Sequence, residues 1–434
     1  MERTQLQENK RDLAVLVGLH SPVLREDSTD EESLQELAAL VETAGGQVVG
    51  SILQSRDKPD PHSFIGEGKV EEVKTMVTLE SATLVIFDND LSPSQIRVLT
   101  ELLGVQVIDR SGLILDIFAQ RAKTREGCLQ VELAQYQYLL PRLIGMWTHL
   151  ERQAGTSGKG PIGSKGPGET QLETDRRHIH RKIDKLKEEL EEVRRVRNTQ
   201  RQRRMKNEIP VVAIVGYTNA GKSTLLNAIT GAGIPANNRL FDTLDTTTRL
   251  LTVSDTLDVV ISDTVGFIRK LPHQLVEAFK ATLEELEYAD LLLHVIDLSN
   301  PQWAQQAQVV DDLIRELKAD HIPCLRVYNK CDLAFSGALP REKDSVYISA
   351  KTGEGIKRLL QAVDEKLDKG TRRVTIHLPY DKAGLLDGLY REAKVENVEY
   401  GETVDITAVC TPRIMGQLKD YIEGWQEEKE DWEQ

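Results

Sequence analysis

Residues 209–224 read IPVVAIVGYTNAGKST, an apolar run followed at once by a turn that contains glycine and lysine. The turn matches the pattern G-x-x-x-x-G-K-[ST] from Gly216 to Ser223, and the next residues continue as a helical stretch. In a strand, loop and helix of this order, glycine lets the backbone wrap a phosphate so that N–H groups and the helix N-terminus point at its oxygens. The stretch therefore predicts an α/β domain with a P-loop.

Two side chains of this loop carry the phosphate chemistry. Lys222 is expected to reach the β and γ phosphates, and the Ser223 hydroxyl is expected to coordinate Mg²⁺. The predicted nucleotide contacts of the loop are Gly216, Tyr217, Thr218, Asn219, Ala220, Gly221, Lys222 and Ser223.

A second apolar run, IPCLRVYNKCD, ends in the pattern N-K-x-D. This pattern indicates which base of a nucleotide the protein binds. Guanine presents two donors on one edge, and a carboxylate such as Asp332 accepts both. Adenine would leave that carboxylate desolvated and unpaired, at a cost of about 1–3 kcal/mol or more. GTP is therefore the expected substrate, with base contacts predicted at Asn329, Lys330, Cys331, Asp332, Ser349, Ala350 and Lys351.

Two switch segments should lie between these motifs. The strand VVISDTVGF contains D-x-x-G as Asp263, Thr264, Val265 and Gly266; its Asp should meet Mg²⁺ through water, and the glycine amide should sense the γ-phosphate. The first switch must supply a threonine to Mg²⁺. Composition alone leaves four candidates, Thr243, Thr246, Thr247 and Thr248.

The residue after D-x-x-G is Phe267, where Ras-like GTPases place a glutamine that orients the attacking water. A phenyl ring can neither accept nor donate, so we expect slow intrinsic hydrolysis and assign no certain catalytic residue. Either a partner supplies the missing group, which can be worth about 10³–10⁵ in rate, or Phe267 merely packs and another side chain of the protein performs the role.

The remaining chain divides into further units. Residues 13–122 alternate apolar runs with amphipathic stretches, which is typical of a parallel α/β sheet covered by helices. Residues 371–422 read as strand, helix, two strands and helix. We predict a multidomain α/β protein: residues 1–122, an N-terminal parallel α/β domain; 123–208, a helical hairpin; 209–370, a P-loop GTPase domain; and 371–434, a small C-terminal α+β domain with an acidic tail.

The hairpin prediction rests on two apolar seams. Leu129, Leu133, Tyr136 and Leu140 form the first, before Pro141 interrupts, and Ile179, Ile183, Leu186, Leu190 and Val193 form the second. Between them lies AGTSGKGPIGSKGPG, in which six of fifteen residues are glycine and both charges are lysines. The alternative is a disordered linker after a single helix.

Composition limits the function classes. The net charge of −14 argues against generic polyanion binding, yet residues 151–208 carry 16 Lys and Arg against 10 Asp and Glu. Four cysteines lie far apart without a C-x-x-C pair, which indicates neither a zinc site nor a disulfide framework. The chain has no apolar run long enough for a membrane span and no secretory signal, so we expect a cytoplasmic protein.

Seven strings of this chain together resemble the HflX family of translational GTPases: GYTNAGKST, FDTLD, DTVGF, NKCD, SAK, GPGETQLETDRR and HSFIGEGKVEE. The resemblance implies that the first switch is Phe241, Asp242, Thr243, Leu244 and Asp245. It selects Thr243 as the second Mg²⁺ ligand beside Ser223, with Thr247 as the runner-up. Thr246 stands where relatives often carry proline, so we expect the switch backbone to differ locally there.

The resemblance also implies a partner. Members of the family associate with the large ribosomal subunit and its rRNA, approach the peptidyl transferase region and are implicated in splitting stalled ribosomes. We therefore expect a protein that is a monomer off the ribosome and that binds rRNA phosphates through the Gly/Lys tip of the hairpin. The alternative is that the basic charge of residues 151–208 decorates a solvated helix face. Two alternatives stay open, a ribosome-independent RNA-remodelling or assembly protein and an enzyme whose N-terminal domain acts on a small molecule.

Overall fold

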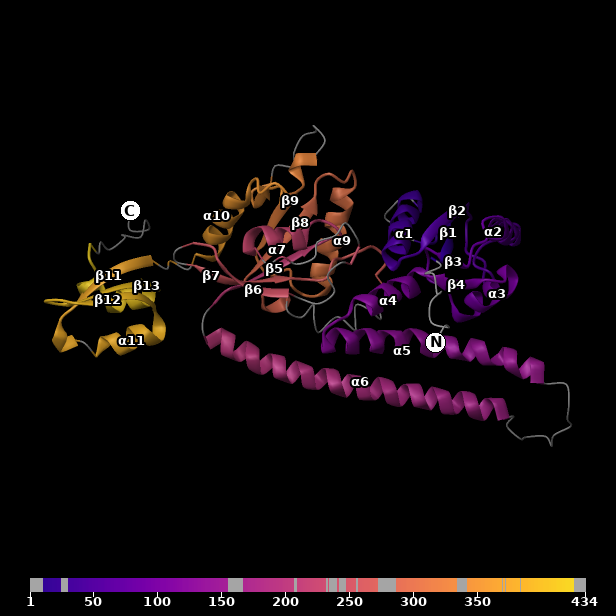
Figure 1. Ribbon diagram of the computed structural model, residues 1–434, viewed down its shortest axis with the longest axis horizontal. Helices are drawn as coiled ribbons and strands as arrows, with labels where there is room; N and C mark the ends of the chain where they lie inside the picture. Colours follow the sequence, from indigo (N-terminus) through magenta and orange to yellow (C-terminus); the bar gives the residue numbers. More distant parts are fainter. Residues whose placement is uncertain are drawn as a thin grey trace, which may run out of the picture.

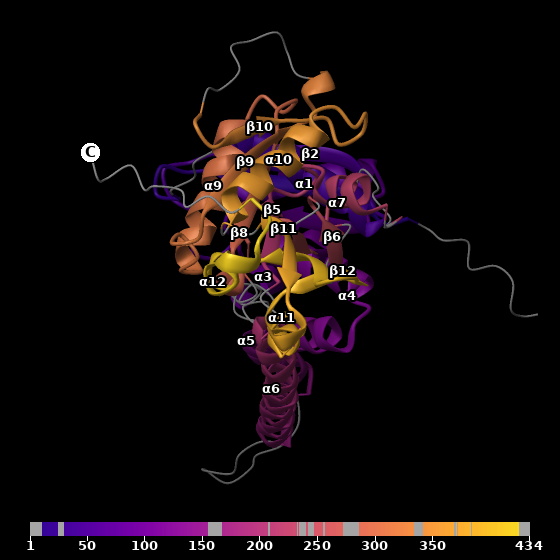
Figure 2. The same ribbon diagram turned by 90° about the vertical axis from the view of Figure 1, so that its left-hand side faces the viewer.

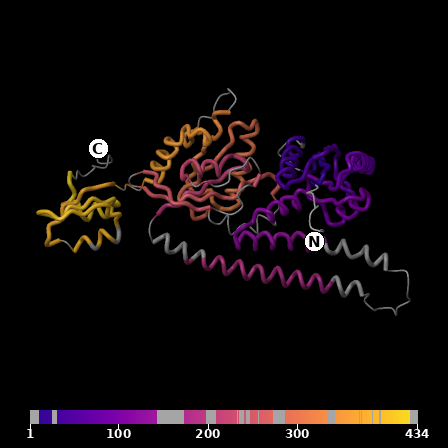
Figure 3. Tube along the Cα trace, in the orientation of Figure 1, coloured from indigo at the N-terminus to yellow at the C-terminus, as the bar shows by residue number. Residues whose placement is uncertain are grey.

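The computed structural model describes residues 11–24, 30–154, 167–206, 209–231, 233, 240–241, 247–254, 257–271, 286–333, 342–368, 370, 372–382 and 384–424. Within these residues the chain forms three sheets and a long helical hairpin. The three sheets follow one another along the longest axis of the molecule, and the hairpin lies to one side of them (Figures 1–3).

The N-terminal domain is a four-stranded sheet of order β2-β1-β3-β4 in which every neighbouring pair is parallel. Apolar residues line both faces: α1 and α4 cover one, and α2 and α3 cover the other. The predicted parallel α/β architecture is confirmed. Its elements are β1 Leu13–His20, α1 Asp30–Ala44, β2 Gln47–Ser55, α2 Glu67–Leu79, β3 Leu84–Phe87, α3 Pro93–Leu103, β4 Gln106–Asp109 and α4 Arg110–Arg121.

The hairpin consists of α5 Arg125–Ala154 and α6 Pro167–Lys206, which run side by side (Figure 1). The two predicted seams pack against each other, with Leu129, Leu133, Ile183 and Leu186 buried at the centre. The lysine-containing loop that we expect at the tip falls mostly on residues 155–166, outside the described residues.

Pro141 does not interrupt the first helix, contrary to the sequence-based expectation, because α5 continues through it. Proline has no N–H and so removes one helical hydrogen bond. Tertiary contacts on both sides of it hold the helix: Asp109 accepts hydrogen bonds from Tyr138 Oη at 2.7 Å and from Arg142 Nη2 at 2.8 Å. Arg142 Nη1 also donates to the carbonyl of Tyr138 at 2.8 Å.

The central domain is a six-stranded sheet of order β10-β9-β8-β5-β7-β6, parallel except for β6, which pairs antiparallel with β7. This order brings the carboxyl ends of β5, β7, β8 and β9 to one edge, where ligands of open α/β sheets bind. Its elements are β5 Val211–Gly216, α7 Lys222–Thr230, β6 Thr247–Thr252, β7 Asp258–Asp263, β8 Leu291–Asp297, α9 Trp303–Glu316, β9 Cys324–Asn329, β10 Ser345–Tyr347 and α10 Ile356–Leu367.

The C-terminal domain is an antiparallel sheet of order β11-β13-β12 with two helices. Its order of strand, helix, two strands and helix is the predicted one, and an ion pair of 2.8 Å between Lys394 and Asp258 connects it to the central domain. The elements are β11 Arg372–Leu378, α11 Leu385–Glu392, β12 Lys394–Tyr400, β13 Val404–Cys410 and α12 Pro412–Gln417. Across the described part of the chain, no helix is long and apolar enough to cross a membrane.

Candidate nucleotide-binding site

The loop between β5 and α7 is a tight backbone turn that requires glycine at two positions. A Cβ on Gly216 would lie 2.3 Å from the carbonyl oxygen of Val295 on β8. Gly221 has a φ of +97°, and a Cβ there would lie 2.2 Å from Asn329 Nδ2. Only glycine fits these close approaches, so the two fixed glycines of the motif shape the loop at the carboxyl edge of the sheet.

Lys222 is buried at the start of α7, with 5% of its surface exposed. Its Nζ donates to the carbonyls of Gly216 at 3.1 Å and Tyr217 at 2.8 Å. Burial lowers the pKa of Lys222 to about 8, although the negative charge of Asp263 opposes this shift. An anion such as a phosphate would satisfy this ammonium better than two neutral carbonyls do.

Ser223 and Asp263 bring two hard oxygen groups together at the end of β7. The Ser223 hydroxyl donates to Asp263 Oδ2 at 2.8 Å, and Asp263 is 1% exposed. Hydroxyl and carboxylate oxygens are the ligands that Mg²⁺ prefers. The residues present therefore fit a magnesium ion held between the P-loop and the second switch.

Gly266 places the second switch against the P-loop. A Cβ on this residue would lie 3.0 Å from Lys222 Nζ and 3.1 Å from Thr218 Cα. The other residues of the motif serve packing: Thr264 Oγ1 donates to the carbonyl of Ile214 at 2.7 Å, and Val265 belongs to the apolar core. Phe267 is 1% exposed in the same core, so its ring packs and presents no polar group to a ligand.

The predicted base loops converge on the P-loop through Asn329. Its Nδ2 donates to the carbonyl of Ala220 at 2.8 Å, and its Oδ1 accepts from the N–H of Ala350 at 3.0 Å. One side chain thus joins the P-loop, the N-K-x-D loop and the Ser349–Lys351 loop. Lys330 forms an ion pair with Asp297 at 2.6 Å. The side chain of Asp332 is exposed, so a guanine base can reach it.

The other members of the predicted base set lie beside these contacts. Ser349 is fully buried and its Oγ accepts from the N–H of Thr352 at 3.2 Å. Cys331 is half-buried, and its N–H donates to the carbonyl of Ile348 at 3.2 Å. Lys351 is exposed at the surface. The structure therefore brings all of these loops to the same edge of the sheet.

The first switch is described only at its ends. Asp242, Thr243, Leu244, Asp245 and Thr246 lie outside the described residues. Phe241 is buried and meets Phe118 of α4 edge to face, with ring centroids 4.6 Å apart. Thr247, the runner-up ligand, belongs to β6 and pairs with Asp263, and Thr248 follows it in the same strand.

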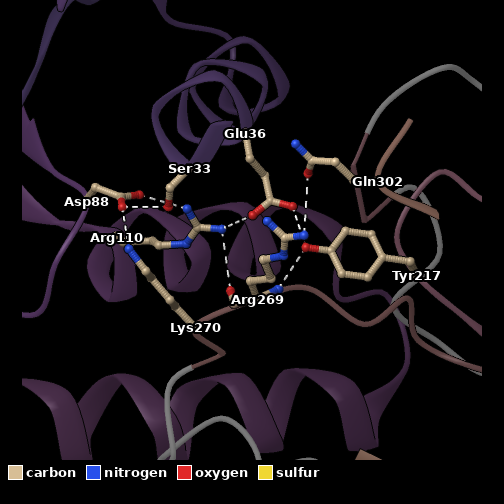
Figure 4. Close-up of polar contacts among 8 residues, drawn as sticks. All are labelled: Ser33, Glu36, Asp88, Arg110, Tyr217, Arg269, Lys270 and Gln302. Atoms are coloured by element: carbon tan, nitrogen blue, oxygen red, sulfur yellow. Dashed lines mark hydrogen bonds and ion pairs between the residues drawn. The ribbon is translucent and has the colours of Figure 1, made fainter. Parts of the chain in front are cut away.

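A polar cluster joins this site to the N-terminal domain (Figure 4). Tyr217 Oη accepts from the N–H of Arg269 at 2.9 Å and donates to Glu36 of α1. Arg110, 1% exposed, pairs with Glu36 and, at 2.8 Å, with Asp88; it also donates to the carbonyl of Arg269 at 3.3 Å. The main-chain N–H and carbonyl of Arg269 are therefore both hydrogen-bonded, to Tyr217 and Arg110 respectively.

The same cluster continues to the next residue of the second switch. Lys270 Nζ pairs with Asp88, which also accepts from Ser33 Oγ at 2.6 Å. Burial raises the pKa of Asp88, but the charges of Arg110 and Lys270 outweigh it and hold the pKa below its ordinary value. We name Glu36, Asp88, Arg110, Tyr217, Arg269 and Lys270 the interdomain cluster.

Sequence reasoning identified only Tyr217 of this cluster. The available signals were weak: Asp109 and Arg110 follow an apolar strand, and two basic residues follow DTVGF. Neither pattern names a partner, because the partners come from a different domain.

The fold and these loops define a P-loop GTP-binding protein of the GTPase class. Family models described as "GTP-binding GTPase N-terminal", "GTP-binding GTPase Middle Region", "50S ribosome-binding GTPase" and "HflX C-terminal domain" match residues 31–119, 121–204, 211–330 and 338–432. The chain is 47% identical over 413 residues to the GTPase HflX of Caldanaerobacter subterraneus subsp. tengcongensis, covering 95% of this chain and 94% of the other. It is 48% identical over 373 residues to the GTPase HflX of Escherichia coli K12, covering 85% and 86%.

This chain therefore belongs to the HflX family of GTPases, and its reaction is the hydrolysis of GTP. Among solved structures, a GTP-binding protein from Sulfolobus solfataricus in complex with GDP is similar at 25% identity and a TM-score of 0.43, covering 82% of this chain and 98% of that chain.

Proposed function

We propose that this GTPase binds the large ribosomal subunit in its GTP-bound form, acts in splitting or rescuing stalled ribosomes, and is released when GTP is hydrolysed. The observation that carries the proposal is the bonding of the segment after D-x-x-G to the N-terminal domain, through Arg110 and Tyr217. Nucleotide-dependent movement of this segment would act directly on the domain that holds the hairpin.

The route from the nucleotide to the hairpin is short. Arg110 contacts the second switch, and the preceding residue, Asp109, accepts hydrogen bonds from Tyr138 and Arg142 of α5. Asp109 is fully buried and also caps α4 by accepting from the N–H of Gly112 at 2.9 Å. A displacement of Arg110 would therefore act on the contacts that Asp109 makes with α5.

The hairpin has the charge that an RNA partner requires. Residues 151–208 carry 16 Lys and Arg against 10 Asp and Glu in a chain of net charge −14. Basic side chains contact phosphates without reading sequence. The family model described as "50S ribosome-binding GTPase" supports the large subunit as the source of that RNA.

Magnesium belongs to the same proposal. Ser223 would hold Mg²⁺ directly and Asp263 would hold it through water, with Thr243 of the first switch as the expected second direct ligand. Bound there, the ion neutralises charge that develops on the phosphates during hydrolysis. Lys222 would bind the β and γ phosphates, and Asp332 would accept both donors of guanine.

Steady-state GTP hydrolysis with and without purified large subunits tests the proposal, alongside a variant that lacks residues 154–168. We expect strong stimulation by the subunits and a weaker one in the variant. Sucrose-gradient analysis of 70S ribosomes should show subunits released with GTP and with a non-hydrolysable analogue, but not with GDP. GTP hydrolysis that large subunits leave unchanged would refute the proposal and favour a ribosome-independent RNA-remodelling switch.

A further inference from the structure

Thr218, the third residue of the P-loop, carries a buried hydroxyl without a hydrogen-bond partner among the described residues. The residue is 6% exposed. A buried hydroxyl that makes no hydrogen bond costs free energy. Such a group is retained at the expense of stability, which indicates a role that the ligand-free protein does not show.

The position of Thr218 suggests what that role is. The point where a Cβ on Gly266 would lie is 3.0 Å from Thr218 Cγ2, 3.1 Å from Thr218 Cα and 3.0 Å from Lys222 Nζ. Thr218 therefore lies against Gly266 through its methyl carbon and Cα, at the same point that Lys222 Nζ approaches. The Lys222 ammonium and the Gly266 amide are the groups that should contact the γ-phosphate. Its own N–H already donates to the carbonyl of Phe267 at 2.7 Å, so the hydroxyl is the remaining hydrogen-bond donor that Thr218 can offer to a ligand.

We propose that Thr218 is a catalytic residue of GTP hydrolysis. Its hydroxyl contacts the γ-phosphate and orients the attacking water. A hydroxyl donates one hydrogen bond and accepts others, so it can donate to a γ-phosphate oxygen and accept from the water. Phe267 can do neither, and its ring is buried in the core. The P-loop thus supplies the group that the second switch lacks.

In this step the water oxygen forms a bond to the γ-phosphorus while the bond from phosphorus to the β–γ bridging oxygen breaks. GDP leaves with that electron pair, and a proton of the water passes to a phosphate oxygen. Thr218 positions the nucleophile and keeps its own proton throughout.

Ser262 provides a matched control because its hydroxyl is also buried and also lacks a partner within the described chain. It is 5% exposed and lies on β7, immediately before Asp263. Successive side chains of a strand point to opposite faces, so Ser262 points away from the side on which Asp263 meets Ser223.

The test compares Thr218→Val, Thr218→Ser and Ser262→Ala in the full-length protein. Single-turnover hydrolysis of radiolabelled GTP gives the rate of the chemical step, and titration with a non-hydrolysable GTP analogue gives the affinity. We expect Thr218→Val to lower the rate by about 10²-fold. The affinity for the analogue should fall by less than the rate, because the contact strengthens in the transition state. Thr218→Ser should keep most of the rate, and Ser262→Ala should keep all of it.

Thermal unfolding of the nucleotide-free protein supplies an independent readout. Thr218→Val should leave the Tm unchanged or raise it, because valine has the shape of threonine without the unpaired hydroxyl. Thr264→Val, which removes a hydroxyl that does donate a hydrogen bond, should lower the Tm. A rate for Thr218→Val within twofold of wild type would overturn the proposal, and so would an equal loss in Thr218→Ser, since shape rather than the hydroxyl would then matter.

Discussion

Replacing Tyr217 with phenylalanine isolates the contact between the P-loop and the N-terminal domain. The change removes a single oxygen, which accepts from the N–H of Arg269 at 2.9 Å and donates to Glu36. The ring itself can keep its place in the apolar core. The variant therefore tests the hydrogen bonds of the interdomain cluster separately from its packing.

The expected magnitude follows from the two lost bonds. A neutral buried hydrogen bond is worth about 0.5–1.5 kcal/mol and one to a charged group about 1.5–3 kcal/mol. The Glu36 side chain is 17% exposed, so water can replace part of the second bond. We expect the state in which the Arg269 N–H is hydrogen-bonded to be destabilised by about 2 kcal/mol. The equilibrium constant for local opening at Arg269 should therefore rise about 30-fold.

Hydrogen exchange measured by mass spectrometry on peptides that span residues 267–271 reads this equilibrium directly. The amide of Arg269 should exchange about 30-fold faster in Tyr217→Phe than in the wild type. Tyr138→Phe is the control, because that tyrosine is half-buried and its hydroxyl donates to Asp109 at 2.7 Å, at the base of the hairpin, without contacting Arg269. If the exchange at Arg269 changed less than twofold, the interdomain cluster would not hold the second switch through Tyr217.

Three further predictions concern nucleotide affinity, base choice and the hairpin. GDP affinity should weaken by up to tenfold per pH unit above about pH 8, because the lowered pKa of Lys222 leaves its amine neutral there and phosphate binds the ammonium form. Calorimetric titration of GDP from pH 7 to 9, with guanosine as the control, measures this change. Equal pH dependence for both ligands would show that Lys222 is not responsible. Asp332→Asn should lower kcat/KM for GTP by about 10–150-fold and favour xanthosine triphosphate, whose carbonyl accepts a hydrogen bond from the new amide. An unchanged preference for GTP in competition kinetics would contradict the assignment of Asp332 as the residue that recognises guanine. Pro141→Ala should raise the Tm, because the restored N–H of α5 adds about 1–3 kcal/mol to the free energy of unfolding. A lower Tm would mean that the proline is required at this point of α5.

The fold was largely predictable because its signals are local. Residues 14–19 of the run LAVLVGLH are buried in β1, and continuous apolar strands alternating with amphipathic helices indicate a parallel sheet. Helix α4 escaped separate prediction because eight of its residues are buried. A helix covered on several sides loses the one-sided apolar pattern by which helices are recognised. Pro141 misled for the opposite reason, since a strong local signal was overruled by the tertiary contacts of Asp109.

The candidate site divides in the same way. The P-loop and N-K-x-D loops were predictable because phosphate and guanine demand particular residue types at fixed spacing, and the structure brings these loops to one edge of the sheet. The interdomain cluster was not predictable, because Glu36 and Tyr217 lie 181 positions apart and neither belongs to a pattern that names the other. Only the fold decides which of many charged surface positions meet.

The variable positions of the P-loop are where this chain departs from a generic phosphate site. Glycine and lysine are fixed by the close approach of the backbone and by the charge of the ligand, so substitutions at Gly221 or Lys222 should abolish binding itself. Tyr217 and Thr218 are free of that requirement, and they face different neighbours: Tyr217 bonds the N-terminal domain, and Thr218 lies against Gly266. Tyr217→Phe should therefore alter coupling between domains at an unchanged hydrolysis step, whereas Thr218→Val should alter the hydrolysis step at unchanged coupling. The two readouts keep the roles apart: hydrogen exchange at Arg269 should change only in Tyr217→Phe, and the single-turnover rate should change only in Thr218→Val.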